Sequence, residues 1–298
     1  MSKNLFIDAS HPNETRVVLK SENEIEDYEY EGTNNSLIKN NIYLGKVSRI
    51  EPSLQAAFID FGRERHGFLS FNDIQSDYYQ IPKSDLDLIK KEEEENRINL
   101  QKKSEIDEKN LEQKDFEEKI LEPEKNFEIN ENEIQSKENF QEIEKNYDIK
   151  QNNLLLSKKK YKIQEVIKPN QVILVQVIKD ERGQKGAALS TFISIAGKYI
   201  VLMPNTPKGG GISRKIFNPA DRKKIRMILN EIEIPKEMGL IVRTAGSNKT
   251  KNEINNDLTT LINSWSQIKE NAINSIAPSL IHQESEIIKR TLRDMFDE

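Results

Sequence analysis

Residues 41–70, NIYLGKVSRIEPSLQAAFIDFGRERHGFLS, decide the fold of the central part of this chain. The stretch contains three runs with strand character, at 42–50, 54–61 and 66–71. Turn-prone residues separate them, Glu51-Pro52-Ser53 after the first run and Gly62-Arg63-Glu64 after the second. Short strands at this spacing are typical of a small β-barrel.

Two phenylalanines stand out in this stretch because strand alternation separates them from the apolar positions. In the second run, Ile59 and Phe61 share one face and Phe58 falls on the opposite, polar face. In the third run, Phe68 is separated from Leu69 in the same way. Exposed aromatic pairs beside basic residues stack the bases of single-stranded nucleic acid. The alternative is that a neighbouring loop covers each ring as ordinary core. The basic residues available for phosphate contacts are Lys46, Arg49, Arg63, Arg65 and Lys185.

Residues 89–160 break the strand pattern with charged, low-complexity sequence. Between 90 and 150 there are 20 acidic and 12 basic residues and no Gly, Ala or Val. The isolated apolar residues keep neither a helical nor a strand period, so we predict a disordered or loosely helical insertion that serves as a solvated spacer. Irregular spacing disfavours a coiled coil, while recruitment of a basic partner or repulsion of RNA stays open. Strand character returns at Val172–Lys179, so the ends of the insertion should lie close together.

The rest of the chain divides into a strand-rich beginning and an alternating end. Residues 5–7, 15–20 and 25–30 predict a strand and a hairpin. Asn218-Pro219 is a helix-start signal, because asparagine caps and proline suits the first turn. The later elements expected are strand at 192–203, a helix from 219 to about 232, a strand at 239–244, a long helix capped by Ser247 or Asn248 and running toward Ile273, and an amphipathic helix at 285–296.

Composition restricts the class of protein. The net charge is −5 for 298 residues, but the acidic insertion accounts for more than all of it, and the remainder is mildly basic, as a phosphate-binding surface requires. Without cysteine, disulfides and thiolate zinc sites are excluded. His11, His66 and His282 show no metal-ligand spacing. No apolar run approaches the roughly 20 residues that span a bilayer, and no signal-peptide pattern is present, so we expect a cytoplasmic protein.

The barrel stretch resembles the S1 domain of the ribonuclease E/G family. Four further segments resemble the 5′-sensor region of that family in the same order. They are GAALSTFISIAGKYIVLMPN at 186–205, GGGISR at 209–214, GLIVRTAG at 239–246 and APSLIHQES at 277–285. Apart from the insertion, the resemblance covers nearly the whole chain.

The resemblance implies a mixed α+β, multidomain chain. An S1 (OB-fold) barrel with a long charged insertion is followed by an α/β 5′-sensor region and by part of a split RNase H-like subdomain. The expected boundaries are 1–40 for the first part of the RNase H-like subdomain, 41–88 and 161–190 for the S1 domain, 89–160 for the insertion, 191–287 for the 5′-sensor region, and 288–298 for the truncated return to the RNase H-like subdomain.

The implied function is recognition of single-stranded RNA within an endoribonuclease of RNA processing and mRNA decay that prefers a 5′-monophosphate. Phe58, Phe68 and Lys185 match the S1 residues that contact RNA, and Arg65 and His66 lie beside them in sequence or on the expected surface. The residues that match the 5′-phosphate pocket are Gly197, Val201, Arg214, Arg243 and Thr244.

Elementary chemistry is compatible with that pocket. An arginine fork, a hydroxyl and backbone amides at a strand-to-helix junction suit the oxygens of a terminal phosphate, and glycine allows close approach. In the alternative interpretation, Arg243 forms a surface ion pair and Gly197 is a turn residue.

The family's catalytic chemistry has no counterpart in this sequence. The resemblance implies magnesium held by two aspartates of a later domain and a zinc-binding Cys-Pro-x-Cys motif, and both are absent here. Asp8 alone is not a two-metal site, and Asp60 and Glu64 are interpreted as surface residues. We therefore expect a fragment that does not cleave RNA by itself, with a homo-oligomer possible in the full-length protein and no DNA or membrane partner indicated. The alternatives are a stand-alone RNA-binding or regulatory protein and a generic S1 module, which leaves GLIVRTAG unexplained.

Overall fold

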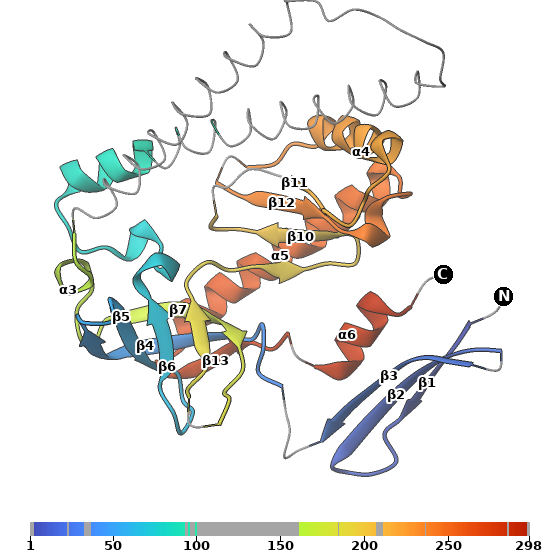
Figure 1. The fold of residues 1–298 in the computed structure, drawn as a ribbon, viewed down its shortest axis with the longest axis horizontal. Coiled ribbons are helices and arrows are strands. Elements are labelled where there is room, and N and C mark those ends of the chain that lie inside the picture. Colours follow the sequence, from blue (N-terminus) through green and yellow to red (C-terminus); the bar gives the residue numbers. More distant parts are fainter. Residues whose placement is uncertain are drawn as a thin grey trace, which may run out of the picture.

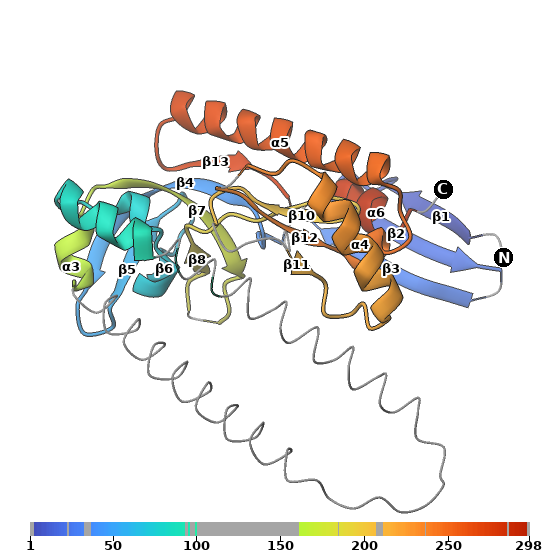
Figure 2. The same ribbon diagram turned by 90° about the horizontal axis from the view of Figure 1, so that it is seen from above.

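The computed structural model describes residues 3–22, 24–32, 37–92, 95, 99, 161–183, 185–206, 211–235, 237–284 and 286–296. Figure 1 shows a β-barrel at one end, a small α/β layer beside it, and a three-stranded sheet at the other end. Figure 2 shows that the long helix α5 (Lys251–Asn274) extends over both the barrel and the α/β layer. The fold is thus mixed α/β, as predicted.

Five strands close the barrel. They are β4 (Ile42–Glu51), β5 (Ala56–Asp60), β6 (Gly67–Ser70), β7 (Val172–Lys179) and β8 (Ala188–Ser190). Hydrogen bonds join them in the order β4-β5-β6-β8-β7, and β7 pairs back with β4. Closure buries one side of every strand, and residues such as Ile59, Phe61 and Leu69 fill the interior. This architecture is consistent with the predicted S1/OB-like barrel.

The described residues on either side of the insertion lie close together, as predicted. Residues 83–92 form a helix, and the short helix α3 (Ile163–Val166) follows the insertion. The Tyr161 hydroxyl donates a hydrogen bond to the Asp85 carboxylate and joins the two sides. Apart from residues 89–92, 95 and 99, the predicted insertion at 89–160 lies outside the described residues.

The α/β layer contains a four-stranded sheet in the order β11-β12-β10-β9. Its strands are β9 (Ile195–Ala196), β10 (Ile200–Met203), β11 (Gly211–Ile212) and β12 (Gly239–Val242). The strand expected at 192–203 is instead the hairpin β9–β10, because the chain reverses between Gly197 and Ile200. The helix α4 (Pro219–Glu231) starts at the Asn218 cap, as predicted.

The predicted cap of α5 was wrong. A 3₁₀ turn η5 (Thr244–Gly246) follows β12, and the helix starts only after Thr250. Thr250 and Glu253 form a capping box in which the threonine hydroxyl accepts from the Glu253 amide and the glutamate accepts from the Thr250 amide. After α5, strand β13 (Ser279–His282) pairs with β4 and attaches the α/β layer to the barrel.

The three-stranded sheet at the other end is antiparallel. It consists of β1 (Lys3–Asp8), β2 (Glu14–Ser21) and β3 (Glu24–Gly32), and helix α6 (Ile287–Asp294) packs against β2 and β3. Arg290 of α6 pairs with Glu29, and the Ile287 amide donates to Glu31 at 3.1 Å. The first and last described parts of the chain therefore lie together (Figure 1). Among the described helices, none combines the length and apolarity needed to cross a bilayer.

Candidate functional site

Two phenylalanine rings meet on the outer face of the barrel. Phe58 of β5 and Phe68 of β6 are directly paired across the strands. Their ring centroids lie 6.0 Å apart in an edge-to-face arrangement with an interplanar angle of 74°. Both side chains are partly exposed, whereas Ile59 and Leu69 beside them are buried. The predicted separation of the phenylalanines from the barrel interior is confirmed.

Arg49 adds a cation to this aromatic pair. It lies opposite Phe58 in the register of β4 and β5, and its guanidinium carbon is 4.5 Å from the Phe58 ring centroid. This geometry is a cation–π contact, which holds the guanidinium at the aromatic face. A base stacked on the ring would therefore have a positive charge within reach of its phosphate.

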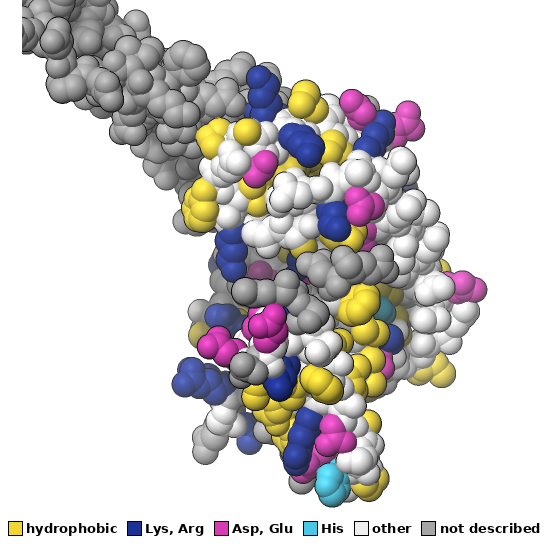
Figure 3. Space-filling view, turned by 90° about the vertical axis from the view of Figure 1, so that its right-hand side faces the viewer, with side chains coloured by type: hydrophobic (Ala, Val, Ile, Leu, Met, Phe, Trp, Pro, Cys, Tyr) yellow, Lys and Arg dark blue, Asp and Glu magenta, His cyan; other side chains and the backbone are white. Residues whose placement is uncertain are grey.

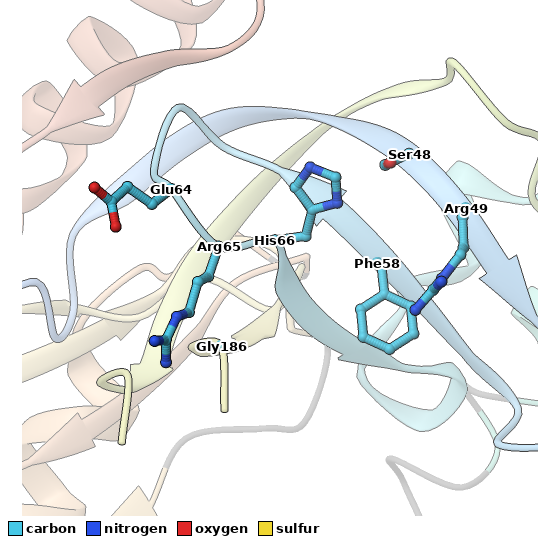
Figure 4. Close-up of a pocket in the computed structure, with 7 residues that line it drawn as sticks. All are labelled: Ser48, Arg49, Phe58, Glu64, Arg65, His66 and Gly186. Carbon is cyan, nitrogen blue, oxygen red and sulfur yellow. The ribbon is translucent and has the colours of Figure 1, made fainter. Parts of the chain in front are cut away.

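A hollow of about 420 Å³ opens beside Phe58. Figure 4 shows Arg49 and Phe58 at one end of it, the His66 imidazole in the middle, and Glu64 and Arg65 at the other end. The loop between β5 and β6 supplies the last three residues. The barrel thus places an aromatic face, two guanidinium groups and an imidazole around one concave surface, which suits a polyanion with planar bases.

Gly186 forms part of the wall of the hollow and allows two loops to touch. A Cβ atom at this position would lie 2.1 Å from the His66 carbonyl oxygen. Arg65 donates to the Gly183 carbonyl from the other loop, and Lys185 lies exposed next to Gly186. The structure therefore places Arg65 and His66 at the hollow, with Lys185 adjacent in sequence to Gly186 of its wall.

We expect Gly186→Ala to destabilise the barrel, because the His66 backbone must move to accommodate a methyl group. Overpacking of this kind costs about 1–3 kcal/mol. Urea denaturation measures the change, and Gly211→Ala is the matched control, since a Cβ there would meet nothing within 4 Å. Equal stability of the two variants would show that the loops separate at no cost.

The second group of predicted residues lies at one edge of the β9–β12 sheet. β11 and β12 are parallel, and the Ser213 amide donates to the Val242 carbonyl at 2.9 Å. Arg214 and Arg243, which follow these strands, therefore leave the sheet at the same edge. The antiparallel strand β10 begins there too, because Ile200 pairs with Val242. All five residues implied for the phosphate pocket lie on this edge or one residue inside it, namely Gly197, Val201, Arg214, Arg243 and Thr244.

Arg243 is held by hydrogen bonds to two sides. One guanidinium nitrogen donates to the Gly197 carbonyl at 2.7 Å, and the other lies 2.7 Å from the Asp294 carboxylate. Its side chain remains 30% exposed. Arg243 thus forms an ion pair, as the alternative interpretation states. Its guanidinium nevertheless remains partly exposed and has five N–H donors in all.

Asp257 of α5 occupies the space expected for a ligand beside Gly197. Its carboxylate accepts from the amides of Tyr199 at 2.8 Å and Ile200 at 3.1 Å. A Cβ at Gly197 would lie 2.6 Å from both carboxylate oxygens. The idea that Gly197 admits a ligand to the backbone is therefore corrected. The close approach serves the protein's own carboxylate, which fixes the turn that orients Arg243.

Asp294 joins the edge of the sheet to α6. Arg293 also contacts it at 3.0 Å and donates to the Ala196 carbonyl at 3.3 Å. Burial opposes ionisation of Asp294, but hydrogen bonds from Arg293 and Arg243 outweigh it and lower the pKa of the carboxyl below its ordinary 3.8. The carboxylate consequently stays charged and paired at neutral pH.

The lowered pKa of Asp294 predicts an acid-dependent loss of stability. Because its folded-state pKa lies below the unfolded value, its contribution is present above that value and is lost as the pH falls through the folded-state pKa. Between about pH 5 and pH 3, the free energy of unfolding should fall more steeply in the wild type than in Asp294→Asn. Urea titrations at each pH measure this, with Asp87→Asn, at an exposed carboxyl, as control. Parallel pH profiles would contradict the prediction.

Sequence reasoning missed Asp257, Asp294 and Arg293. Asp257 lies 60 residues after Gly197, on a helix whose inward face is otherwise marked by its apolar residues. In the sequence, Asp257 is simply a polar residue of a helix. The spacing does not indicate that it lies beside the turn at Gly197. Arg49 was included as a phosphate contact but not as a partner of Phe58.

The acidic residues do not form a metal site in the described part of the chain. No group of three or more His, Asp or Glu side chains that could hold a metal occurs among these residues. The Asp8 carboxylate accepts from the Ser10 amide at 3.0 Å, and Asp60 accepts from the Gly62 amide at 3.1 Å. The magnesium implied by the resemblance therefore has no fitting ligand set in the part described.

Comparison with known proteins agrees with these motifs. The sequence model of the ribonuclease E/G family matches residues 194–298. Over 292 residues, or 98% of the chain, the sequence is 35% identical to ribonuclease E of Escherichia coli (strain K12) and 34% identical to ribonuclease E of Haemophilus influenzae. Ribonuclease E of Buchnera aphidicola subsp. Acyrthosiphon pisum is 35% identical over the same length. The chain spans 21%, 23% and 24% of these three proteins. The predicted resemblance to the ribonuclease E/G family is therefore confirmed over nearly the whole chain.

Proposed function

We propose that this chain is the RNA-recognition part of a ribonuclease E-type endoribonuclease and that it binds single-stranded RNA on the barrel. The paired, partly exposed rings of Phe58 and Phe68 carry this proposal. They lie beside a hollow with Arg49, Arg65 and His66 at its walls. Aromatic faces stack bases of any sequence while the cations meet the phosphates, so the surface suits an unpaired strand.

A 5′-monophosphate is the proposed ligand of the sheet edge around Arg243. A terminal phosphate carries more charge than an internal phosphodiester and accepts several hydrogen bonds. The Gly197 carbonyl and Asp294 orient the Arg243 guanidinium without enclosing it, and Arg214 and Thr244 are exposed at the same edge. Binding of the phosphate either uses the remaining N–H groups of Arg243 or replaces Asp294.

In the whole protein, these two surfaces would hold the strand while another part hydrolyses a phosphodiester bond. The described residues contribute binding and orientation, and we expect the chain alone to bind RNA without cleaving it. The ribonuclease names of the relatives support the class of reaction.

Fluorescence anisotropy with one RNA in two forms tests the proposal. The 298-residue chain should bind a 5′-monophosphorylated oligonucleotide more tightly than the same oligonucleotide with a 5′-hydroxyl, and duplex RNA more weakly than either. Salt must be matched, because counterion release alone changes affinity strongly. Equal affinity for the two end groups would remove the 5′-phosphate site, and a preference for duplex would remove the stacking face.

A further inference from the structure

Phe217 is the most exposed aromatic side chain among the described residues, with 85% of its surface accessible. It lies between β11 and α4, three residues after Arg214. Three residues of chain span at most about 11 Å, so the ring lies near the sheet edge that holds Arg214 and Arg243. An exposed ring so close to a proposed ligand site needs a reason.

The loop that carries Phe217 is firmly held. Ile216 is buried with 5% exposure, and its amide donates to the Ser213 carbonyl at 3.1 Å. On the other side, the Asn218 side chain accepts from the Ala220 amide at 3.1 Å and caps α4. Arg222 of α4 donates to the Ile216 carbonyl at 3.2 Å. With both neighbours fixed, the ring is presented to solvent by a defined backbone.

The charge around Phe217 is positive. Arg214 and Lys215 precede it, and Lys223 and Lys224 are exposed just over one turn along α4. The two acidic residues of α4 have partners of their own. Asp221 accepts from the Asn218 side chain at 3.0 Å, and Glu231 pairs with Lys251 at 3.0 Å. In Figure 3, Lys and Arg side chains lie among hydrophobic and acidic ones in the upper part of the described surface, the level at which Figure 1 places α4.

We propose that Phe217 and the basic residues around it form a second stacking site for single-stranded RNA, which holds the first bases after the 5′ end. This inference rests on the proposed function of the neighbouring sheet edge. Charge decides between RNA and a protein as the occupant. A protein-docking ring would be surrounded by apolar or neutral side chains, whereas here four exposed cations match the phosphates that flank a stacked base.

Binding of RNA to Phe217→Ala tests the proposal. The variant should bind a 5′-monophosphorylated single-stranded oligonucleotide at least about fivefold more weakly than the wild type, the lower end of the loss expected for one stacked base. Phe217→Trp should retain wild-type affinity because it keeps an aromatic face. Ile276→Ala is the matched control, since it removes an 89% exposed apolar side chain from another loop.

Two further RNAs separate this inference from the proposed function. With a 5′-hydroxyl RNA, Phe217→Ala should show the same loss, so the result does not depend on phosphate recognition. With an RNA whose second and third nucleotides are abasic, wild type and Phe217→Ala should bind equally. An affinity within twofold of wild type on the intact RNA would overturn the proposal and point to a protein partner. A full loss that persists on the abasic RNA would overturn the placement near the 5′ end.

Discussion

Arg243→Ala should weaken binding of 5′-monophosphorylated RNA by about 10- to 100-fold, while binding of 5′-hydroxyl RNA changes by less than about twofold. The difference is expected because the Arg243 guanidinium is oriented by a backbone carbonyl and remains partly exposed. The Gly197 carbonyl fixes one nitrogen, and the second faces Asp294. Anisotropy titrations with both RNAs at one salt concentration give the two affinities.

Two further variants isolate the cause of that loss. Arg243→Lys keeps the charge but loses the planar fork, so it should recover only a small part of the preference. Arg16→Ala removes a charge from the exposed Arg16–Glu14 pair on β2, and it controls for the general electrostatic effect. If Arg16→Ala reduced the preference as much as Arg243→Ala, recognition of the end group would not involve the sheet edge.

The double substitution Phe58→Ala and Phe68→Ala should lower affinity for single-stranded RNA by at least about tenfold, whatever its 5′ end. Each stacked base contributes about 1–3 kcal/mol, and removal of both rings leaves the hollow without an aromatic face. The ratio of affinities for the two end groups should stay at its wild-type value. Loss of affinity together with an unchanged ratio is the expected signature of a site distinct from the sheet edge.

Stability must be followed in parallel, because the edge-to-face contact of the two rings also contributes about 0.5–1.5 kcal/mol to the barrel. Phe71→Ala is the matched control. Phe71 stacks on Tyr79 with a centroid distance of 5.8 Å and packs against the barrel core, outside the residues that line the hollow. It should lower stability to a similar degree and leave RNA affinity unchanged. Equal losses of affinity in both variants would mean that the Phe58 and Phe68 effect is structural.

The barrel face was predictable because strand alternation is local. Once residues 56–61 were interpreted as a strand, the burial of Ile59 and the outward position of Phe58 followed from geometry. The start of α5 was readable in the same way, since Thr250 and Glu253 have the spacing of a capping box, but Ser247 or Asn248 was predicted as the cap instead. Closure of the barrel through β4 and β7 agreed with the expectation that the insertion interrupts one domain.

The surroundings of Arg243 could not be predicted, because its contacts come from remote elements. Asp257 and Asp294 lie on two helices that approach the sheet edge only in the folded protein. Asp257 accepts hydrogen bonds from the amides of the turn at Gly197, and Asp294 pairs with the Arg243 guanidinium. Sequence spacing does not indicate an acceptor for either of these donors. The sequence therefore indicated residues that lie together at this edge of the sheet, but it did not indicate the side chains that pair with them.

Affinity as a function of RNA length tests most directly whether one strand is held at two separate places. For 5′-monophosphorylated RNAs that increase in length from a dinucleotide, the cost of Arg243→Ala should already be present in the shortest RNA that binds. The loss of affinity caused by the double substitution of Phe58 and Phe68 should appear only when the strand is long enough to reach the barrel. Losses of affinity that rise together at every length for both variants, or no effect of Arg243→Ala at any length, would contradict binding at two separate places.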